Sequence, residues 1–342
     1  MHKRSAILWL ITIILTISIV DGYVRLFTPP EADGRDVTVV ISKGLSFSLI
    51  ADNLQSAGVI RNAKGFSFLA SLKGAYRKVK AGEYIFNTSM RPLNVLNKLV
   101  NGETRRYKVT IPEGRNIREM AVLLEKADLA EKEEFISKAF DKALASSMGV
   151  NGDTFEGYLF PDTYYLTKGM PAEEIIGKMV NRFKEIYTED IAEKAAKLGL
   201  SQREVVTLAS IIEKETGNPE ERRHISAVFH NRLKRRMPLQ SDPTVIYGIS
   251  DFDGNLTKKH LRTRTPYNTY LFYGLPPGPI SNSGEASIEA AVNPAKADYL
   301  YFVSKNNGSH HFSKSLRDHN RAVSVYQKKK VRLKRTPGGK SR

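Results

Sequence analysis

The sequence predicts an α+β protein with a single N-terminal transmembrane helix, a small α/β module and a larger mixed α+β domain. Three observations support this prediction. An uncharged run of sixteen residues, SAILWLITIILTISIV, separates the basic segment MHKR from Asp21. Beyond it, β-branched segments alternate with segments whose apolar residues recur at helical spacing. At Ser201 a capping box with Glu204 begins a long apolar helix.

The N-terminal run has the pattern of a signal anchor. Basic residues before an apolar run predict residues 1–4 in the cytoplasm, 5–25 across the membrane and the remainder outside, after a linker over 26–36. At about 1.5 Å per residue the uncharged run spans roughly 24 Å, which is short for a hydrocarbon core of about 30 Å. A cleaved signal peptide is the alternative, but Val20-Asp21-Gly22 lacks the small residues of a cleavage site.

The formal net charge of +17 favours anionic partners. Nucleic acid is not expected among them, because the chain is predicted to leave the cytoplasm and carries no nucleic-acid-binding motif. Part of the charge lies in 328–342, which holds eight Lys or Arg and no acid, and is predicted to be a disordered basic tail. The absence of cysteine excludes disulfides, thiolate metal sites and a cysteine nucleophile. No metal-binding or phosphate-binding motif is present, so we expect neither metal nor cofactor.

Two segments of the chain share one plan. Residues 37–41 form a predicted strand, two helical segments follow, and a short strand begins at Gly82. About seventy residues later the plan returns, with Gly114 in the place of Gly44 and GYLF in the place of GEYIF. This predicts a strand–helix–helix–strand module over 37–105 and a second copy, with an insertion, over 106–185.

The first copy also resembles a known sugar-binding module. A strand followed by the pattern KGxSxxxIAxxL is similar to the LysM carbohydrate-binding module. The resemblance implies affinity for an N-acetylglucosamine polymer and no catalysis.

The C-terminal part is predicted as helices and one hairpin. ERRHISAVFHNRLKRR, SIEAAVNP and LRDHNRAVSVYQKKK have helical patterns, and YLYFVSKNNGSHHFS has alternating aromatics around an Asn307-Gly308 turn.

Glu215 is the candidate catalytic residue of the helix that begins after Ser201. It follows Ile211 by four residues and Ile212 by three, so it projects from the apolar face of that helix. Desolvation raises the pKa of a carboxyl group, as a general acid requires near neutral pH. A structural ion pair is the alternative, and the spacing alone does not decide between them. Glu213 lies about 160° away, at the margin of the apolar face.

Two loops are rich in groups that recognise sugars. LQSDPT and TPYNTY supply hydroxyls, amides and aromatic faces, which bind sugar hydroxyls and stack on the apolar faces of sugar rings. Asx turns at Asp242 and Asn268 would also explain these residues. The expected substrate-binding residues in the two loops are Gln240, Ser241, Asp242, Thr244, Tyr267 and Asn268.

The motifs ASIIEKET, VFHNRL, LQSDPTVIYG, TPYNTY, GLPPGPI and AVNPAKADYLYFV occur in this order. Because of these motifs the chain resembles the endolytic murein transglycosylase (MltG, YceG-like) family, and the resemblance covers nearly its whole length. The resemblance implies a peptidoglycan lytic transglycosylase. Such an enzyme cleaves glycan strands between N-acetylmuramic acid and N-acetylglucosamine and leaves 1,6-anhydro ends. It also implies that 106–327 is the catalytic domain and that the second Glu of EKET, Glu215, is catalytic.

The same resemblance implies a cellular location and binding partners. It implies a single-pass protein of the bacterial cytoplasmic (inner) membrane, with peptidoglycan strands and peptidoglycan synthases as partners. The implied role is to end the elongation of nascent strands. We also expect Glu213 and Tyr247 to contact the substrate.

Two other functions stay open at this point. The chain could be a non-catalytic cell-wall-binding scaffold that uses the LysM-like module. It could also be a muramidase-type hydrolase, for which Asp242 would be the second carboxylate.

Overall fold

The computed structural model describes residues 2–328 of the chain, so all but the first residue of the predicted basic tail lies outside the described residues. The chain divides into two compact units, each discontinuous in sequence. Unit 1 comprises Met1–Val109, Ala127–Ala130 and Tyr164–Pro171, and unit 2 comprises Thr110–Lys126, Glu131–Thr163 and Ala172–Arg342.

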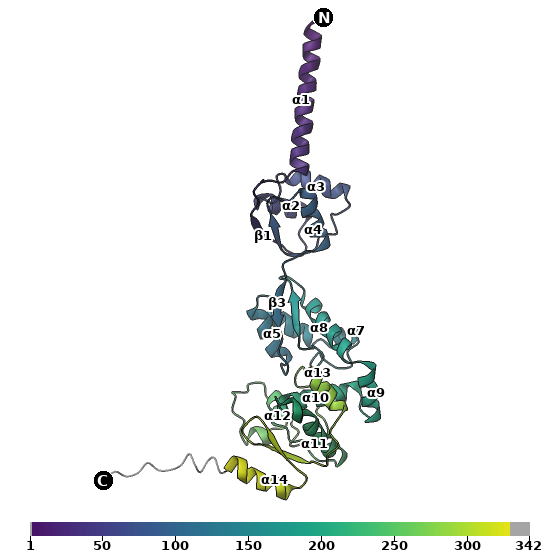
Figure 1. Ribbon diagram of the computed structural model, residues 1–342, viewed down its shortest axis with the longest axis vertical. Helices are drawn as coiled ribbons and strands as arrows, with labels where there is room; N and C mark the ends of the chain where they lie inside the picture. Colours follow the sequence, from purple (N-terminus) through teal and green to yellow (C-terminus); the bar gives the residue numbers. More distant parts are fainter. Residues whose placement is uncertain (1, 329–342) are drawn as a thin grey trace, which may run out of the picture. The chain divides into compact units, whose positions relative to one another are not determined.

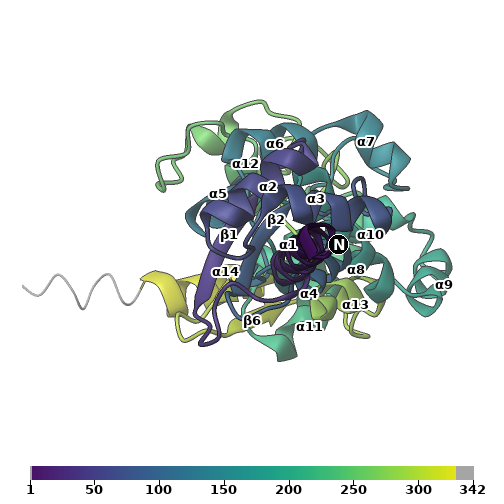
Figure 2. The ribbon, with the colours of Figure 1, turned by 90° about the horizontal axis from the view of Figure 1, so that it is seen from above.

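Unit 1 contains the helix α1 (His2–Phe27) and a strand–helix–helix–strand motif. The motif comprises β1 (Asp36–Ile41), α2 (Phe47–Ser56), α3 (Ala63–Leu72) and β2 (Gly82–Asn87), with α4 (Pro92–Asn101) after it (Figures 1 and 2). β1 and β2 are antiparallel, and Val39 lies opposite Tyr84. Because alternate strand residues face the helices, Tyr84 and Phe86 are fully buried, together with Leu54 and Phe66.

The segment predicted as a membrane anchor is helical, but the span itself is not found. In the part of the chain that the structure describes, no helix is both long enough and apolar enough to cross a membrane. The prediction of a transmembrane helix over 5–25 is therefore not confirmed.

The strand–helix–helix–strand order returns in the second predicted copy. It comprises β3 (Tyr107–Thr110), α5 (Ile117–Lys126), α6 (Lys132–Ala139), an additional α7 (Lys142–Ser147), β4 (Thr163–Leu166) and α8 (Ala172–Ile186). β3 and β4 form a two-stranded sheet, as β1 and β2 do. The first division between the units falls after Val109, but unit 1 also includes Ala127–Ala130 and Tyr164–Pro171. The predicted domain bounds of 37–105 and 106–327 stay a prediction. Sugar binding by the LysM-like module stays a prediction, because strand order alone does not identify a ligand.

The remainder of unit 2 is a helical cluster with one hairpin (Figure 1). α10 (Gln202–Glu215) packs against α11 (Arg222–Lys234) and α13 (Glu285–Val292), and every residue from Val205 to Ile212 is buried. The capping box at Ser201 and Glu204 starts α10 as predicted. The other elements are α9 (Glu189–Lys197), η1 (Pro219–Glu221), α12 (Asp242–Tyr247), η2 (His260–Arg262), β5 (Tyr301–Ser304), β6 (His310–Ser313), α14 (Leu316–Val323) and η3 (Ser324–Lys328).

The β5–β6 hairpin confirms the prediction from alternating aromatic residues. Phe302 lies opposite Phe312, and Val303 lies opposite His311. The turn has left-handed backbone at Asn306 and Gly308. The hairpin forms one side of the cavity described below.

Gly157 provides a test of close packing within unit 2. Its φ is +85°, and a Cβ there would lie 2.6 Å from both Pro279 and Val206. We expect Gly157→Ala to lower the free energy of unfolding by at least about 2 kcal/mol, because overpacking and left-handed strain add. Guanidinium denaturation measures this. Gly199→Ala is the control, since Gly199 has φ +71° and open space around it. Equal losses in the two variants would contradict the packing argument.

Candidate active site

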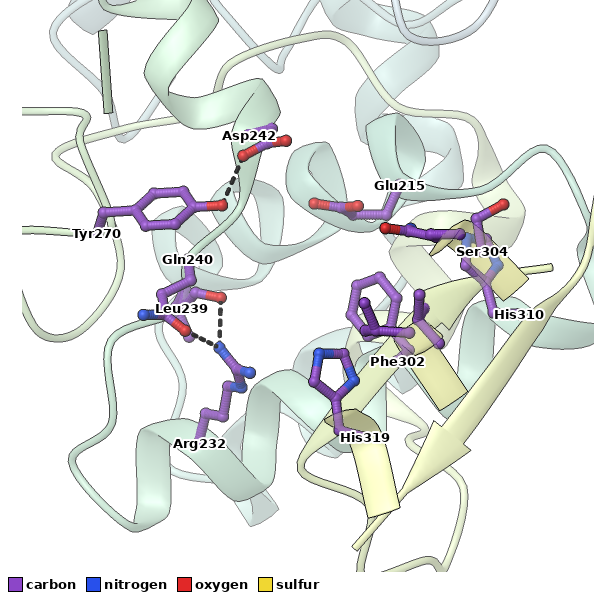
Figure 3. Close-up of a pocket in the computed structure, with 13 residues that line it drawn as sticks. Glu215, Arg232, Leu239, Gln240, Asp242, Tyr270, Phe302, Ser304, His310 and His319 are labelled. Atoms are coloured by element: carbon purple, nitrogen blue, oxygen red, sulfur yellow. Dashed lines mark hydrogen bonds between the residues drawn. The ribbon is translucent and has the colours of Figure 1, made fainter. Parts of the chain in front are cut away.

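Glu215 is the last residue of α10, and its carboxyl group lines a cavity of about 390 Å³ (Figure 3). The helix ends here because Thr216 adopts extended backbone angles. Burial, with a smaller contribution from the charge of Asp242, raises the pKa of Glu215 to about 7, although Ser241 and Arg232 oppose the rise. A carboxyl group with this pKa is populated in both protonation states near neutral pH. It can therefore give a proton to a leaving group and accept one later.

The loop before α12 holds the other side of the Glu215 carboxyl group. The Ser241 hydroxyl donates a hydrogen bond to Glu215 Oε1 at 2.5 Å. Asp242 Oδ1 accepts from the Tyr270 hydroxyl at 2.6 Å, so this second carboxylate of the cavity is held in place. Gln240 adopts a left-handed conformation with φ +52°. Its backbone N–H donates to the Thr269 carbonyl, and the Ser241 N–H donates to the Thr269 hydroxyl; together they fix the loop against the TPYNTY segment.

Arg232 of α11 lines the same cavity and is buried, with 8% of its surface exposed. Its Nε donates to the Leu300 carbonyl at 2.7 Å, and its guanidinium lies 5.2 Å from the Tyr301 ring centre. Nη1 donates to the carbonyls of Pro238 and Leu239 at 3.1 and 2.9 Å. The residue therefore fixes the loop before α12 while it places a positive charge beside the cavity.

The hairpin and α14 contribute two histidines to the cavity. Both Glu221 oxygens accept from His310, one from its backbone N–H at 2.8 Å and one from Nδ1 at 2.7 Å. These two contacts hold the His310 ring against η1. His319 stacks on Tyr301 at 5.2 Å, and its buried Nδ1 has no hydrogen-bond partner in the described chain.

The structure brings some of the predicted site residues together. Glu215, Gln240 and Asp242 line the cavity, and Ser241 contacts Glu215. Five other predicted residues do not line the cavity: Glu213, Thr244, Tyr247, Tyr267 and Asn268. Glu213 accepts from the Gly284 N–H and lies 3.7 Å from Arg222. Thr244 donates to the Ser241 carbonyl.

Contacts within the protein account for those remaining residues. Asn268 is fully buried and donates to the carbonyls of Leu261 and Thr263, while its Oδ1 accepts from the Tyr270 N–H. Tyr247 and Tyr267 pack edge to face with ring centres 4.8 Å apart. Substrate contact by these side chains stays a prediction.

The sequence prediction missed several residues of the cavity, although one was within reach. Arg232 follows Val228 by four residues and Phe229 by three, the spacing that identified Glu215 on α10. The others come from the hairpin and α14, where no local pattern distinguishes them: Phe302, Ser304, His310 and His319.

A second buried carboxyl group lies outside the cavity lining. Glu156 is 2% exposed, and burial raises its pKa to about 8. It accepts from the Ile117 N–H at 3.2 Å, from Asn282 Nδ2 at 3.0 Å and from the Tyr247 hydroxyl at 3.0 Å. These partners belong to α5, to the loop before α13 and to α12, so Glu156 joins three parts of unit 2. Within the described residues, no group of three or more potential metal ligands is found.

Comparisons with known proteins agree with this architecture. The YceG-like family matches residues 39–325. An endolytic murein transglycosylase of Bacillus subtilis (strain 168) is 36% identical over 318 residues, covering 88% of this chain and 88% of that protein. One of Streptococcus pneumoniae (strain ATCC BAA-255 / R6) is 32% identical over 339 residues, covering 89% of this chain but 61% of that longer protein. A yceG-like protein of Listeria monocytogenes, solved at 2.6 Å, gives a TM-score of 0.58 at 35% identity and covers 84% of this chain and 98% of its own. The chain therefore belongs to the YceG-like family.

Proposed function

We propose that the chain is a lytic transglycosylase that cleaves murein glycan strands between N-acetylmuramic acid and N-acetylglucosamine. The relatives from Bacillus and Streptococcus are named endolytic murein transglycosylases, which supports the reaction class. The observation that carries the assignment of Glu215 is its position: a carboxyl group with a pKa of about 7 faces a cavity of about 390 Å³. A cavity of this size is within the usual range for ligand sites.

One carboxyl group suffices for the proposed chemistry. Protonated Glu215 donates its proton to the glycosidic oxygen as the bond to the muramic C1 breaks, through an oxocarbenium-like state. The resulting carboxylate then accepts the proton of the muramic C6 hydroxyl while O6 bonds to C1 of the same sugar. Glu215 is protonated again, the 1,6-anhydro end is formed, and no water is consumed. The Ser241 hydrogen bond and the Arg232 charge stabilise the intermediate carboxylate.

A muramidase-type hydrolase is the second candidate, and Asp242 is the observation in its favour. This carboxylate lines the same cavity as Glu215 and is held by Tyr270. Hydrolases commonly use such a second carboxylate to direct a water molecule or to form a covalent intermediate.

Product analysis separates the candidates. Purified glycan strands are incubated with the protein, and the new ends are identified by mass spectrometry. We expect 1,6-anhydro-muramic ends, which lack one water relative to reducing ends. Reducing ends would establish hydrolysis instead. Formation of neither end would contradict both enzymatic proposals and favour a cell-wall-binding scaffold.

The place of action follows from the proposed substrate. Murein lies outside the cytoplasmic membrane, so the proposal places unit 2 there, and the carboxylates of its stem peptides complement the net charge of +17. Localisation at the cytoplasmic membrane, contact with peptidoglycan synthases and a role in ending strand elongation stay predictions.

Substitution of Ser241 tests how its hydrogen bond affects the pKa of Glu215. Its hydrogen bond lowers the pKa of Glu215, so we expect Ser241→Ala to move the alkaline limb of the kcat/KM profile to higher pH. We also expect a loss of about threefold to tenfold in kcat, because the carboxylate intermediate loses one donor. Anhydro-end formation from pH 5 to 9 measures both effects. Ser250→Ala, on an exposed residue of the loop after α12, is the control. An unchanged pH profile would contradict this role of Ser241.

A further inference from the structure

Arg232 is a buried cation whose hydrogen-bond acceptors are all neutral. Nε donates to the Leu300 carbonyl, and Nη1 donates to two carbonyls and to Gln240 Oε1 at 3.3 Å. Within the described residues it forms no ion pair with a carboxylate, although only 8% of its surface is exposed. A buried charge without a counter-ion is costly, so its retention beside a cavity points to a ligand.

The unengaged edge of this guanidinium faces the cavity. Nη2 donates no hydrogen bond within the described chain, and Figure 3 shows that edge of Arg232 turned toward the space between His319 and Glu215. His319 borders the same space, and its buried Nδ1 also has no partner among the described residues. Arg232 and His319 therefore line the same cavity, and each has a nitrogen without a hydrogen-bond partner among the described residues. Buried polar groups are normally paired, so His319 Nδ1 requires an explanation.

The two acidic residues of the cavity do not explain why these groups lack partners. Asp242 accepts from Tyr270, and Glu215 accepts from Ser241. In the proposed reaction Glu215 begins protonated and is then neutral, so Arg232 has no anionic partner in the reactive state. An external carboxylate would supply that partner, and an Arg N–H pair binds carboxylates strongly.

We propose that Arg232 and His319 form a carboxylate-binding subsite within the Glu215 cavity, which takes a carboxylate of the muramyl unit at the point of cleavage. This inference rests on the proposed function. Murein offers such a carboxylate from two sources. One is the lactyl group of a muramic acid that has lost its stem peptide, and the other is a free carboxylate of the stem peptide itself.

Occupation of this subsite would change the ionisation of the general acid. The charged and titratable groups around Glu215 are Asp242, Arg232 and Tyr270, with His310 and His319 on the hairpin side of the cavity. Arg232 lowers the pKa of Glu215, and a bound carboxylate offsets this charge. Glu215 therefore keeps its proton to higher pH in the complex than in the free enzyme. The alkaline limb of kcat should lie at higher pH than that of kcat/KM, for carboxylate-bearing strands only.

The test compares four preparations of the same glycan strands with the full chain. Strands without stem peptides carry free lactyl carboxylates, and a matched sample has these converted to methylamides. Strands with stem peptides are prepared with their carboxylates either free or amidated. We expect kcat/KM to be at least tenfold higher for one carboxylate form than for its neutral match, and the pair that differs identifies the source. Values within twofold in both pairs would overturn the subsite.

Failure of the subsite and failure of the proposed function are distinguishable. If all four preparations give anhydro ends at similar rates, the function stands and the subsite is wrong. If none gives anhydro ends, the proposed function fails, and with it the basis for the subsite.

Variants connect the preference to the two residues. Arg232→Gln should reduce the ratio of kcat/KM between charged and neutral strands to nearly one, whereas Arg235→Gln, on an exposed residue of the same helix end, should keep it. Because Arg232 also fixes the loop before α12, a second variant is required in case Arg232→Gln does not fold. His319→Phe then tests the subsite, since it keeps an aromatic ring against Tyr301 and removes the unpaired nitrogen. A preference unchanged in His319→Phe and in folded Arg232→Gln would overturn the assignment.

Discussion

Glu215→Gln is expected to lower the rate of anhydro-end formation by at least about 100-fold, while strand binding is retained. The amide has nearly the same shape as the carboxyl group, but it cannot donate the proton that the leaving sugar requires, and general acid catalysis contributes about 10²–10⁴-fold. Anhydro ends quantified by mass spectrometry give the rate, and co-sedimentation with strands measures binding. Glu220→Gln, at an exposed position in η1, is the matched control and should keep its activity within twofold.

The same variant has an expected effect on stability that reports burial independently of catalysis. The pKa of Glu215 is raised by burial from its ordinary value of 4.5 to about 7 in the folded protein. The unfolded chain therefore loses this proton first, and the folded state loses relative stability as pH rises from about 4.5 to about 7. Glu215→Gln should remove this part of the pH dependence and be more stable than wild type at pH 8. A variant that loses neither activity nor this pH dependence would refute the buried general acid.

Glu156→Ala is expected to destabilise the protein by about 2–4 kcal/mol. The substitution leaves the Ile117 N–H, the Asn282 amide and the Tyr247 hydroxyl without their acceptor, in a site from which water is largely excluded. Glu156→Gln keeps the volume and one acceptor oxygen, so its loss should be smaller. Denaturant titration measures both variants. Glu125→Gln, on an exposed residue of α5, is the control and should change stability by less than about 0.5 kcal/mol.

The pH dependence of this effect has a definite sign. Burial raises the pKa of Glu156 from 4.5 to about 8 in the folded state, so the unfolded state again ionises first. Wild type should lose stability between about pH 4.5 and 8, by at most about 1.4 kcal/mol per pH unit from this group. Glu156→Gln should show a flatter profile across the same range. A profile parallel to that of wild type would mean that Glu156 is ionised in the folded protein.

Local periodicity explains what could be predicted of the site. A helix of 3.6 residues per turn determines which side chains share a face, so the spacing of Ile211, Ile212 and Glu215 was sufficient to place Glu215 at the core side of α10. The capping box and the hairpin are local as well, and both are confirmed. The same reasoning applied to α11 would have identified Arg232.

Long-range contacts explain which parts of the site could not be predicted from the sequence. Ser241 is 26 residues from Glu215 along the chain, and Glu221 is 89 residues from His310, yet each pair is joined by a hydrogen bond. Tyr247 and Asn268 have the composition of sugar-binding residues, but their hydrogen bonds to Glu156 and to loop carbonyls direct them away from the cavity. Polar side chains in loops satisfy whichever partner the fold brings near, and composition does not specify that partner.

The sequence by itself determined the α+β class, the repeated strand–helix–helix–strand plan, the capped helix and the acid at its end. These features depend on residues a few positions apart, whose geometry is fixed by the backbone period. Only the tertiary structure decided which side chains surround that acid: the Ser241 donor, the buried Arg232 and the two histidines beyond the hairpin turn. Their positions depend on how distant segments pack, because the cavity exists only where α10, α11, the loop before α12 and the hairpin meet.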